Sequence, residues 1–367
     1  MDKNEEMESV HLYSTLPLFD DEVCSECLPY EEDNISITYE KRGEDREFGS
    51  ELRNQIYGLH WPGKFNSKLK SQAPIDAYLR FCPEKSFNED DSKNICIEGD
   101  SLLTLKFLKN DYEEKIKVIY IDLSYKILDN SCKDKNKRIA YWLSDVYEKL
   151  NIAKDLLSNN GLIFLIVEGN ELADLILICY EIFGRDNLLG IFPRLTNRSS
   201  KTAKVISQNN DFIVAFSRSE DFTLNLPIRS DKGGVKTRPI STLDFIDNRY
   251  SNDKARKDLI AIFGKKIFDS PKPVNLVRDL LCLASDSDSL ILDLSSKSGV
   301  VGQAVLELNA QDNGRRNFIL ADVGDNVAER VRAIGKKLQK EDDFSNLWMD
   351  LGFKYFHIVD TFKEVDK

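Results

Sequence analysis

Three aspartates, Asp122, Asp293 and Asp322, each lie at the end of a short apolar run that is typical of a buried strand. In an α/β protein with parallel strands, ligands bind at the carboxyl ends of the strands. A carboxylate at that edge can accept hydrogen bonds from the amino or hydroxyl groups of a ligand. These positions are therefore candidate site residues, and Asp100, which follows the apolar run 95–97, is a fourth.

Alternating strands and helices are expected to position these side chains. Apolar runs rich in β-branched residues indicate strands, and leucines at helical spacing indicate helices. The alternation predicts an α/β fold with a mostly parallel sheet and helices on both faces. The expected strands are 95–97, 118–121, 162–167, 211–216, 290–294 and 318–321. The expected helices are 102–110, 141–157, 171–183, 301–308 and one that ends at Ala284.

The charge of the chain is unevenly distributed. Residues 1–50 hold 15 Asp and Glu against 4 Lys and Arg, which equals the whole formal charge of −11, and the other residues are balanced at 47 against 47. We interpret 1–50 as an acidic tail that is either disordered or a docking segment, and 51–91 as an arm that packs on the core. Residues 92–367 form the main domain, with a polar, loop-rich and basic insertion at about 217–270.

The seven cysteines and the first residues bear on the compartment. An odd cysteine count without a secreted-domain pattern favours reduced thiols and a cytoplasmic protein. Cys24 and Cys27 have metal or redox spacing, but no second such pair or nearby histidine completes a site, so we expect no metal. The chain starts without a signal-peptide pattern, and it has no apolar run long enough to span a membrane.

Five segments carry a resemblance to a known family. They are Tyr57–Lys64, Asn94–Asp100, Ile116–Asp122, Ala153–Phe164 and Ala304–Asn309. In this order they resemble the Mod subunits of type III restriction-modification systems, from about Leu52 to Lys337. The resemblance implies a Rossmann-like, circularly permuted methyltransferase fold in which the catalytic strand precedes the cofactor strand. It also implies methyl transfer from S-adenosylmethionine to the N6 atom of an adenine that is flipped out of the duplex.

The catalytic motif of the family, Asp-Pro-Pro-Tyr, matches Asp122-Leu123-Ser124-Tyr125. The resemblance implies that Asp122 would orient the adenine amino group and that Tyr125 would stack on the base. Each proline of the motif fixes φ and removes an N–H, so their replacement by Leu123 and Ser124 leaves the turn less constrained. We therefore expect a poor catalytic site, and Asp122 is alternatively a plain strand-end carboxylate.

The cofactor loop departs from the family pattern too. Where the family has Asp-Phe-Phe-Ala-Gly-Ser-Gly, this chain has Asp293 to Gly299, with Lys297 in place of the first glycine. Lysine brings a long charged side chain into a place where backbone must approach the ligand. The resemblance implies that Asp322 would bind the ribose hydroxyls of the cofactor and that Asp100 would lie in a turn beside the cofactor. Asp100 would serve equally well as a helix cap. We expect that the chain binds no cofactor. If the chain is active, its cofactor is S-adenosylmethionine.

Basic residues supply candidate DNA contacts. The insertion is much shorter than the target-recognition domain that Mod subunits carry, and 229–266 hold ten Lys and Arg against five Asp. Such a strip suits phosphate contact, which positions DNA without reading its sequence, although a solvated loop is equally consistent with it. The candidates are Arg194, Arg198, Lys201, Lys204, Lys236 and Arg238.

These observations lead to three hypotheses. The first is a degenerate, non-catalytic Mod-like subunit that dimerises with an active DNA adenine methyltransferase, as a heterodimer or homodimer, and contacts the DNA backbone. The second is an active N6-adenine methyltransferase with a divergent site, which uses Asp122 and Tyr125 on the base and Asp100, Asp293, Gly299 and Asp322 on the cofactor. The third is an interaction protein that docks through its acidic tail.

Overall fold

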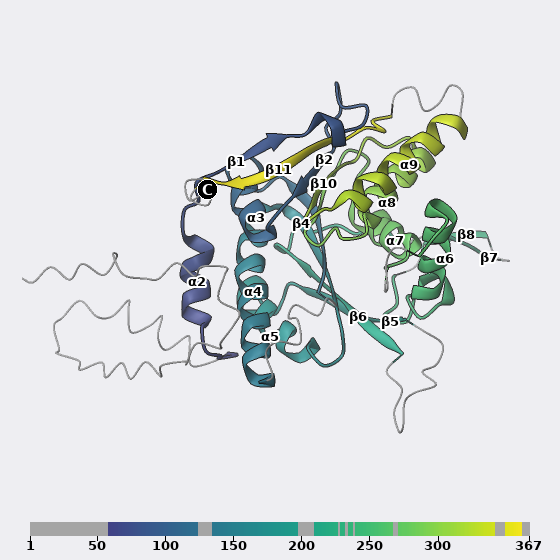
Figure 1. Ribbon diagram of the computed structural model, residues 1–367. Helices are drawn as coiled ribbons and strands as arrows, with labels where there is room; N and C mark the ends of the chain where they lie inside the picture. Colours follow the sequence, from purple (N-terminus) through teal and green to yellow (C-terminus); the bar gives the residue numbers. More distant parts are fainter. Residues whose placement is uncertain are drawn as a thin grey trace, which may run out of the picture.

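Two layers of helices enclose a central sheet (Figure 1). The computed structural model describes residues 58–123, 134–196, 209–226, 228–231, 234–237, 239–266, 271–341 and 349–361. Within these ranges a nine-stranded sheet has the order β1-β11-β2-β10-β9-β3-β4-β6-β5. Its strands are β1 (Ala77–Phe81), β2 (Ile95–Glu98), β3 (Ile116–Asp122), β4 (Leu157–Val167), β5 (Leu188–Leu195), β6 (Asn210–Ser217), β9 (Leu290–Asp293), β10 (Asn317–Ala321) and β11 (Lys354–Asp360).

The middle of the sheet is parallel, as the sequence predicts. Strands β11, β2, β10, β9, β3 and β4 pair in parallel with their neighbours, whereas β1, β6 and β5 are antiparallel additions at the two edges. Strand β3 is apolar along nearly its whole length because both of its faces are covered. Val118 and Tyr120 enter one core cluster, and Ile119 and Ile121 enter the other.

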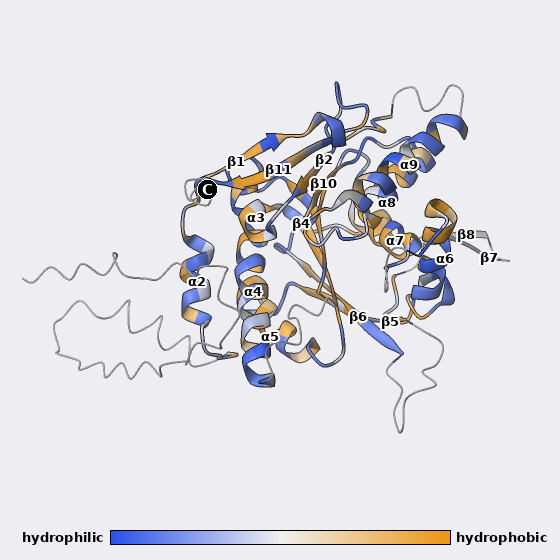
Figure 2. Ribbon diagram, viewed as in Figure 1, coloured by the Kyte–Doolittle hydropathy of each residue, from blue (hydrophilic) through white to orange (hydrophobic). Residues whose placement is uncertain are grey.

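Helices cover both faces of the sheet. One face carries α3 (Ser101–Tyr112), α4 (Lys135–Leu156) and α5 (Leu172–Phe183), and the other carries α7 (Val274–Ala284), α8 (Val300–Asp312) and α9 (Asp325–Glu341). In Figure 2 the central strands are hydrophobic, and the outer helices show a hydrophilic side as well. Because every central strand is covered on both faces, the predicted α/β architecture is confirmed. In the part of the chain that the structure describes, no helix is both long and apolar enough to cross a membrane.

The described part of the N-terminal arm packs on the core, as expected. Its helix α2 (Lys64–Gln72) lies along α4, and β1 extends the sheet through antiparallel pairing with β11. The Trp61 indole N–H donates to Ser144 Oγ at 2.9 Å, and its ring meets Tyr147 edge to face, with 5.5 Å between ring centroids. One buried aromatic anchor thus holds the arm to α4.

The insertion is more ordered than the sequence indicates. It contains a hairpin of β7 (Ile228–Asp231) and β8 (Gly234–Thr237), a short 3-10 helix η2 (Asn248–Tyr250) and the helix α6 (Asn252–Phe263). The loop-rich description is therefore wrong for 252–263. The charged sequence of α6 hides two apolar side chains, Ala255 and Leu259, that are buried on one side of the helix.

Candidate active site and its buried charge network

The carboxyl ends of β10, β9 and β3 bring three of the candidate aspartates to one edge of the sheet. These strands are direct neighbours, and the pairing sets Asp293 opposite Leu320 on one side and Tyr120 on the other. Asp322 follows β10 directly, and Asp122 ends β3. The sequence-based expectation that these aspartates share an edge thus agrees with the sheet order.

Asp293 is the most deeply buried of the three, with a relative exposure of 1%. Its Oδ1 accepts the N–H of Ser295 at 3.0 Å, and Ser295 Oγ in turn accepts the N–H of Asp122 at 2.6 Å. Burial raises the pKa of Asp293 to about 7 against the lowering effect of the Ser295 N–H, and the charges of Asp122 and Asp322 add smaller increases. The buried carboxyl of Asp293 is therefore linked through Ser295 to Asp122 at the end of β3.

The loop after Asp293 is held by backbone contacts. Ser296 N–H donates to Ala321 O at 3.1 Å, and Arg330 on α9, which is buried, donates to Ser298 O at 2.7 Å. Gly299 has φ +66°, and a Cβ placed there would lie 3.1 Å from Val327 Cγ1. The left-handed backbone conformation and the close Val327 side chain both favour glycine at this position.

Lys297 and Asp322 face each other across the loop. Lys297 Nζ lies 3.9 Å from Asp322 Oδ2, and the two side chains are 44% and 42% exposed. Burial raises the pKa of Asp322, and the positive charge of Lys297 opposes this increase. The lysine in the position of the first family glycine thus neutralises the carboxylate that the resemblance assigns to the ribose.

Asp100 caps a helix. Its Oδ1 accepts the N–H of Leu103 at 2.7 Å at the start of α3, which agrees with the helix-cap alternative. The preceding Gly99 has φ +127°, and a Cβ there would come within 2.6 Å of Ile358 Cγ2 on β11. Both residues therefore have structural roles that need no ligand.

A buried charge network, made of Lys272, Asp122, Asp211 and Arg194, lies beside this edge. Lys272 Nζ is 3.2 Å from Asp122 Oδ2 and 3.4 Å from Asp211 Oδ2, and the lysine side chain is only 5% exposed. Arg194 forms a two-pronged pair with Asp211, with Nε 2.7 Å from Oδ1 and Nη2 bonded to Oδ2. Two positive charges therefore meet two negative charges.

The network also reaches the insertion. Arg194 Nη1 donates to Tyr250 O at 2.7 Å and to Asn252 Oδ1 at 3.0 Å. The prediction that Arg194 contacts DNA is wrong for this structure, because its side chain is fully buried and its guanidinium is bonded to protein groups. Sequence reasoning missed Lys272 as a site residue, although the flanking Pro271 and Pro273 marked the segment as unusual.

Several candidates lie outside the described residues. They are Ser124, Tyr125, Arg198, Lys201, Lys204 and Arg238. Lys236 lies on β8, opposite Arg229 of β7. Cys24 and Cys27 also fall outside, and within the described ranges no group of three or more His, Cys, Asp or Glu is arranged to hold a metal ion.

The N6_N4_Mtase family model, described as DNA methylase, matches residues 116–341, which is more than half of the chain. The chain belongs to this DNA methylase family. It is also similar to the EcoPI Mod subunit of Escherichia phage P1, at 23% identity over 85% of this chain and 73% of that protein. The StyLTI Mod subunit of Salmonella typhimurium is 24% identical over 83% of this chain and 66% of the relative. The resemblance to Mod subunits is confirmed.

Two solved structures illustrate the likeness. PvuII DNA methyltransferase, which is cytosine-N4-specific, has a TM-score of 0.47 at 14% identity and covers 69% of this chain and 88% of its own. The complex of M1.HpyAVI with S-adenosylmethionine has a TM-score of 0.43 at 14% identity, over 66% and 98% of the two chains. Membership of the DNA methylase family and the parallel sheet confirm the predicted Rossmann-like fold. The permuted order is present as well, because β3 precedes its sheet neighbour β9 in the chain.

Asp122→Asn is expected to destabilise the methylase fold. The substitution removes a negative charge 3.2 Å from the ammonium of the buried Lys272, and the loss of one partner of a buried pair costs roughly 3 kcal/mol. Urea unfolding of the purified variant measures this change. The matched control is Asp253→Asn, which removes a surface i,i+3 pair with Arg256 and should change stability by less than about 0.5 kcal/mol. Equal effects of the two substitutions would show that Asp122 is not a structural anchor.

Asp293 makes stability depend on pH. Its folded pKa of about 7 lies above its unfolded value of about 4, so the folded state holds an extra proton between these values. The resulting stabilisation is complete below about pH 4 and is lost as the pH rises to about 7, at up to about 1.4 kcal/mol per pH unit. Between pH 5 and pH 7 the natural chain should therefore lose about 2 kcal/mol more than Asp293→Asn in urea unfolding. Parallel pH curves for the two proteins would contradict this assignment.

Proposed function

We propose that this chain is a non-catalytic Mod-like subunit that assembles with an active DNA methylase subunit. The observation that carries the proposal is the contact of Lys297 with Asp322, with 3.9 Å between Nζ and Oδ2. In the family pattern these positions belong to the cofactor loop and to the carboxylate that holds ribose hydroxyls. Here that carboxylate already has a cationic partner from the protein itself.

The residues of the loop fit S-adenosylmethionine poorly. Lys297 does not have a positive φ, so the loop does not adopt at this position the left-handed conformation that glycine favours. Two positive charges about 5 Å apart repel by roughly 3 kcal/mol at an effective dielectric near 20, so an ammonium in the cofactor loop would disfavour a sulfonium bound beside it. We therefore assign no methyl-transfer step to this chain.

The surroundings of Asp122 support the same proposal. An aspartate that orients an adenine amino group must keep an acceptor oxygen directed at the base. Asp122 instead has one oxygen within 3.2 Å of the buried Lys272, and its backbone N–H is bonded to Ser295. The carboxylate at the catalytic position thus stabilises the fold by pairing with the buried Lys272.

A surface on α2 and α4 is a candidate for subunit contact. Four large apolar side chains lie exposed on these neighbouring helices, namely Phe65, Leu69, Ile139 and Tyr141, and their relative exposures are 64%, 44%, 47% and 54%. Exposed large apolar side chains on adjacent elements can mark a protein interaction site. We propose that this surface binds the active methylase subunit, and that Arg198, Lys201 and Lys204 contact DNA phosphates in the assembly.

The second candidate function is an active DNA N6-adenine methyltransferase. It is favoured by the position of Asp122, which ends β3 beside the strand of Asp293 and keeps a side chain that is 23% exposed. Methyl incorporation into adenine by the purified chain, lost in Asp122→Ala while the variant stays folded, would support this alternative over the first.

Calorimetric titration with S-adenosylmethionine tests the cofactor argument. The natural chain should show no binding at about 1 mM ligand, whereas Lys297→Gly should bind at least about tenfold more tightly because the repulsion and the Asp322 pair are both removed. Lys297→Met separates charge from backbone conformation, since it removes the ammonium and keeps a side chain. Micromolar binding by the natural chain would overturn the proposal.

Assembly is tested by sedimentation of the full chain with each DNA methylase encoded beside its gene. We expect a stable complex with one of them, or a homodimer, that is weakened at least about tenfold by Ile139→Asp combined with Tyr141→Asp. The matched control is Leu243→Asp, which alters an apolar side chain that is 63% exposed in the insertion. A chain that stays monomeric in every mixture contradicts the proposed function.

A further inference from the structure

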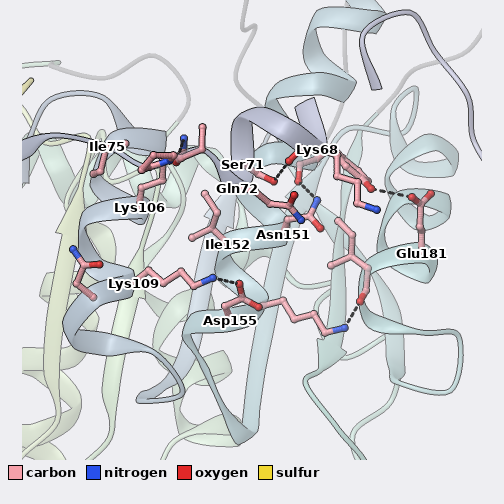
Figure 3. Close-up of a pocket in the computed structure, with 16 residues that line it drawn as sticks. Lys68, Ser71, Gln72, Ile75, Lys106, Lys109, Asn151, Ile152, Asp155 and Glu181 are labelled. Carbon is pink, nitrogen blue, oxygen red and sulfur yellow. Dashed lines mark hydrogen bonds and ion pairs between the residues drawn. The ribbon is translucent and has the colours of Figure 1, made fainter. Parts of the chain in front are cut away.

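A hollow of about 680 Å³ lies on the α2 side of the molecule, away from the candidate active site. Figure 3 shows residues of α2, α3 and α4 that surround it. Its lining includes the last turns of α3 and α4, at Lys109 and Asp155. These helices begin near the carboxyl edge of the sheet, so their last turns lie toward the opposite edge from Asp122 and Asp293.

The lining of the hollow carries an excess of positive charge. Four lysines line it, Lys68, Lys106, Lys109 and Lys154, against two acids, Asp155 and Glu181. Both acids are already paired: Asp155 lies 2.7 Å from Lys109 Nζ, and Glu181 lies 2.7 Å from the ammonium of Lys64, outside the lining. Within the described part of the chain, Lys68, Lys106 and Lys154 have no carboxylate within 4.0 Å.

Two of these three ammonium groups are held in place by backbone carbonyls. Lys106 Nζ donates to Ala73 O at 3.1 Å, and Lys154 Nζ donates to Ile182 O. Burial lowers the pKa of both lysines, and the charges of Lys70 and Arg218 lower them further. The lining of the hollow therefore holds two partly buried cations, and an anion bound near either of them would stabilise its charged form.

The other lining residues suit an organic ligand. Ile75, Ile152 and Ile182 offer apolar surface, and three side-chain amides offer donors and acceptors, namely Gln72, Asn110 and Asn151. The volume is within the range of about 300 to 1,000 Å³ that is usual for small-molecule sites. The lining holds more lysines than acids, and lysine is a common binder of phosphate groups.

We propose that this hollow binds a phosphate ester of nucleotide size, with its phosphate groups between Lys68, Lys106 and Lys154. The apolar and amide side chains contact its organic part. The hollow lies on two of the helices of the proposed subunit surface, α2 and α4, but it is lined by other side chains of these helices, and none of its residues belongs to the cofactor loop or to the network around Lys272.

Calorimetric titration of the full chain tests this site with three probes in magnesium-free buffer of low ionic strength: ATP, inorganic triphosphate and adenosine. ATP and triphosphate should bind with a Kd below about 1 mM, and ATP more tightly, whereas adenosine alone should show no binding. The double variant Lys68→Met with Lys106→Met should raise the Kd for ATP at least about tenfold.

The matched control is Lys257→Met on α6, which makes the same charge change on an exposed helix on the other side of the molecule (Figure 1). It should change the Kd less than about twofold because surface charges at this distance are screened. The Lys68→Met single variant guards against misfolding, since no hydrogen bond to the fold is lost with it, and it should weaken ATP binding at least about threefold. Absence of triphosphate binding, or equal binding by the double variant and the Lys257→Met control, would overturn the proposal.

Discussion

The compensation of two buried cations, Lys272 and Arg194, constrains the rest of the site. Lys272 and Arg194 have almost no exposure, and an unpaired charge in such a position costs several kcal/mol. Asp122 and Asp211 supply the compensation, so the end of β3, the start of β6 and the segment before α7 must meet at one point. Arg194 extends this constraint to the insertion through Tyr250 and Asn252. The buried hydrogen bonds of Arg194 therefore hold the insertion to the methylase sheet.

This constraint changes the meaning of the catalytic motif. An aspartate at the end of the catalytic strand is usually evidence of chemistry, because the family uses it on the base. In this chain the same carboxylate neutralises a lysine that is 5% exposed, and the fold would require it with or without a substrate. Retention of Asp122 is thus not sufficient evidence of activity. The comparison of motifs alone could not reveal this, because Lys272 lies 150 positions further along the sequence.

The sequence predicted the central elements well because their signals are local. Residues 162–167 are apolar without interruption, which indicates a strand covered on both faces, and β4 has that environment. Arg194 shows where local signals end. It stands in a basic stretch, yet the pairing of β5 with β6 sets it opposite Asp211, and the pair is buried beneath η2 and α6. Antiparallel register and burial depend on contacts between distant segments, which composition cannot report. The helix α6 was missed for a related reason. It has few apolar residues, and only the folded structure shows that Ala255 and Leu259 are buried.

Among the residues that the structure describes, the motif positions that this chain keeps have a structural role in the fold. The positive φ of Gly299 and its contact with Val327 favour glycine, and Asp100 caps α3. Asp293 holds the N–H of Ser295 from the interior. The motif prolines and the first loop glycine have been replaced, and no contact of the fold requires glycine where Lys297 stands with an ordinary φ. A working active site would constrain both groups of residues equally. The kept residues are therefore explained by the fold itself, and this is the division that the proposed non-catalytic subunit role predicts.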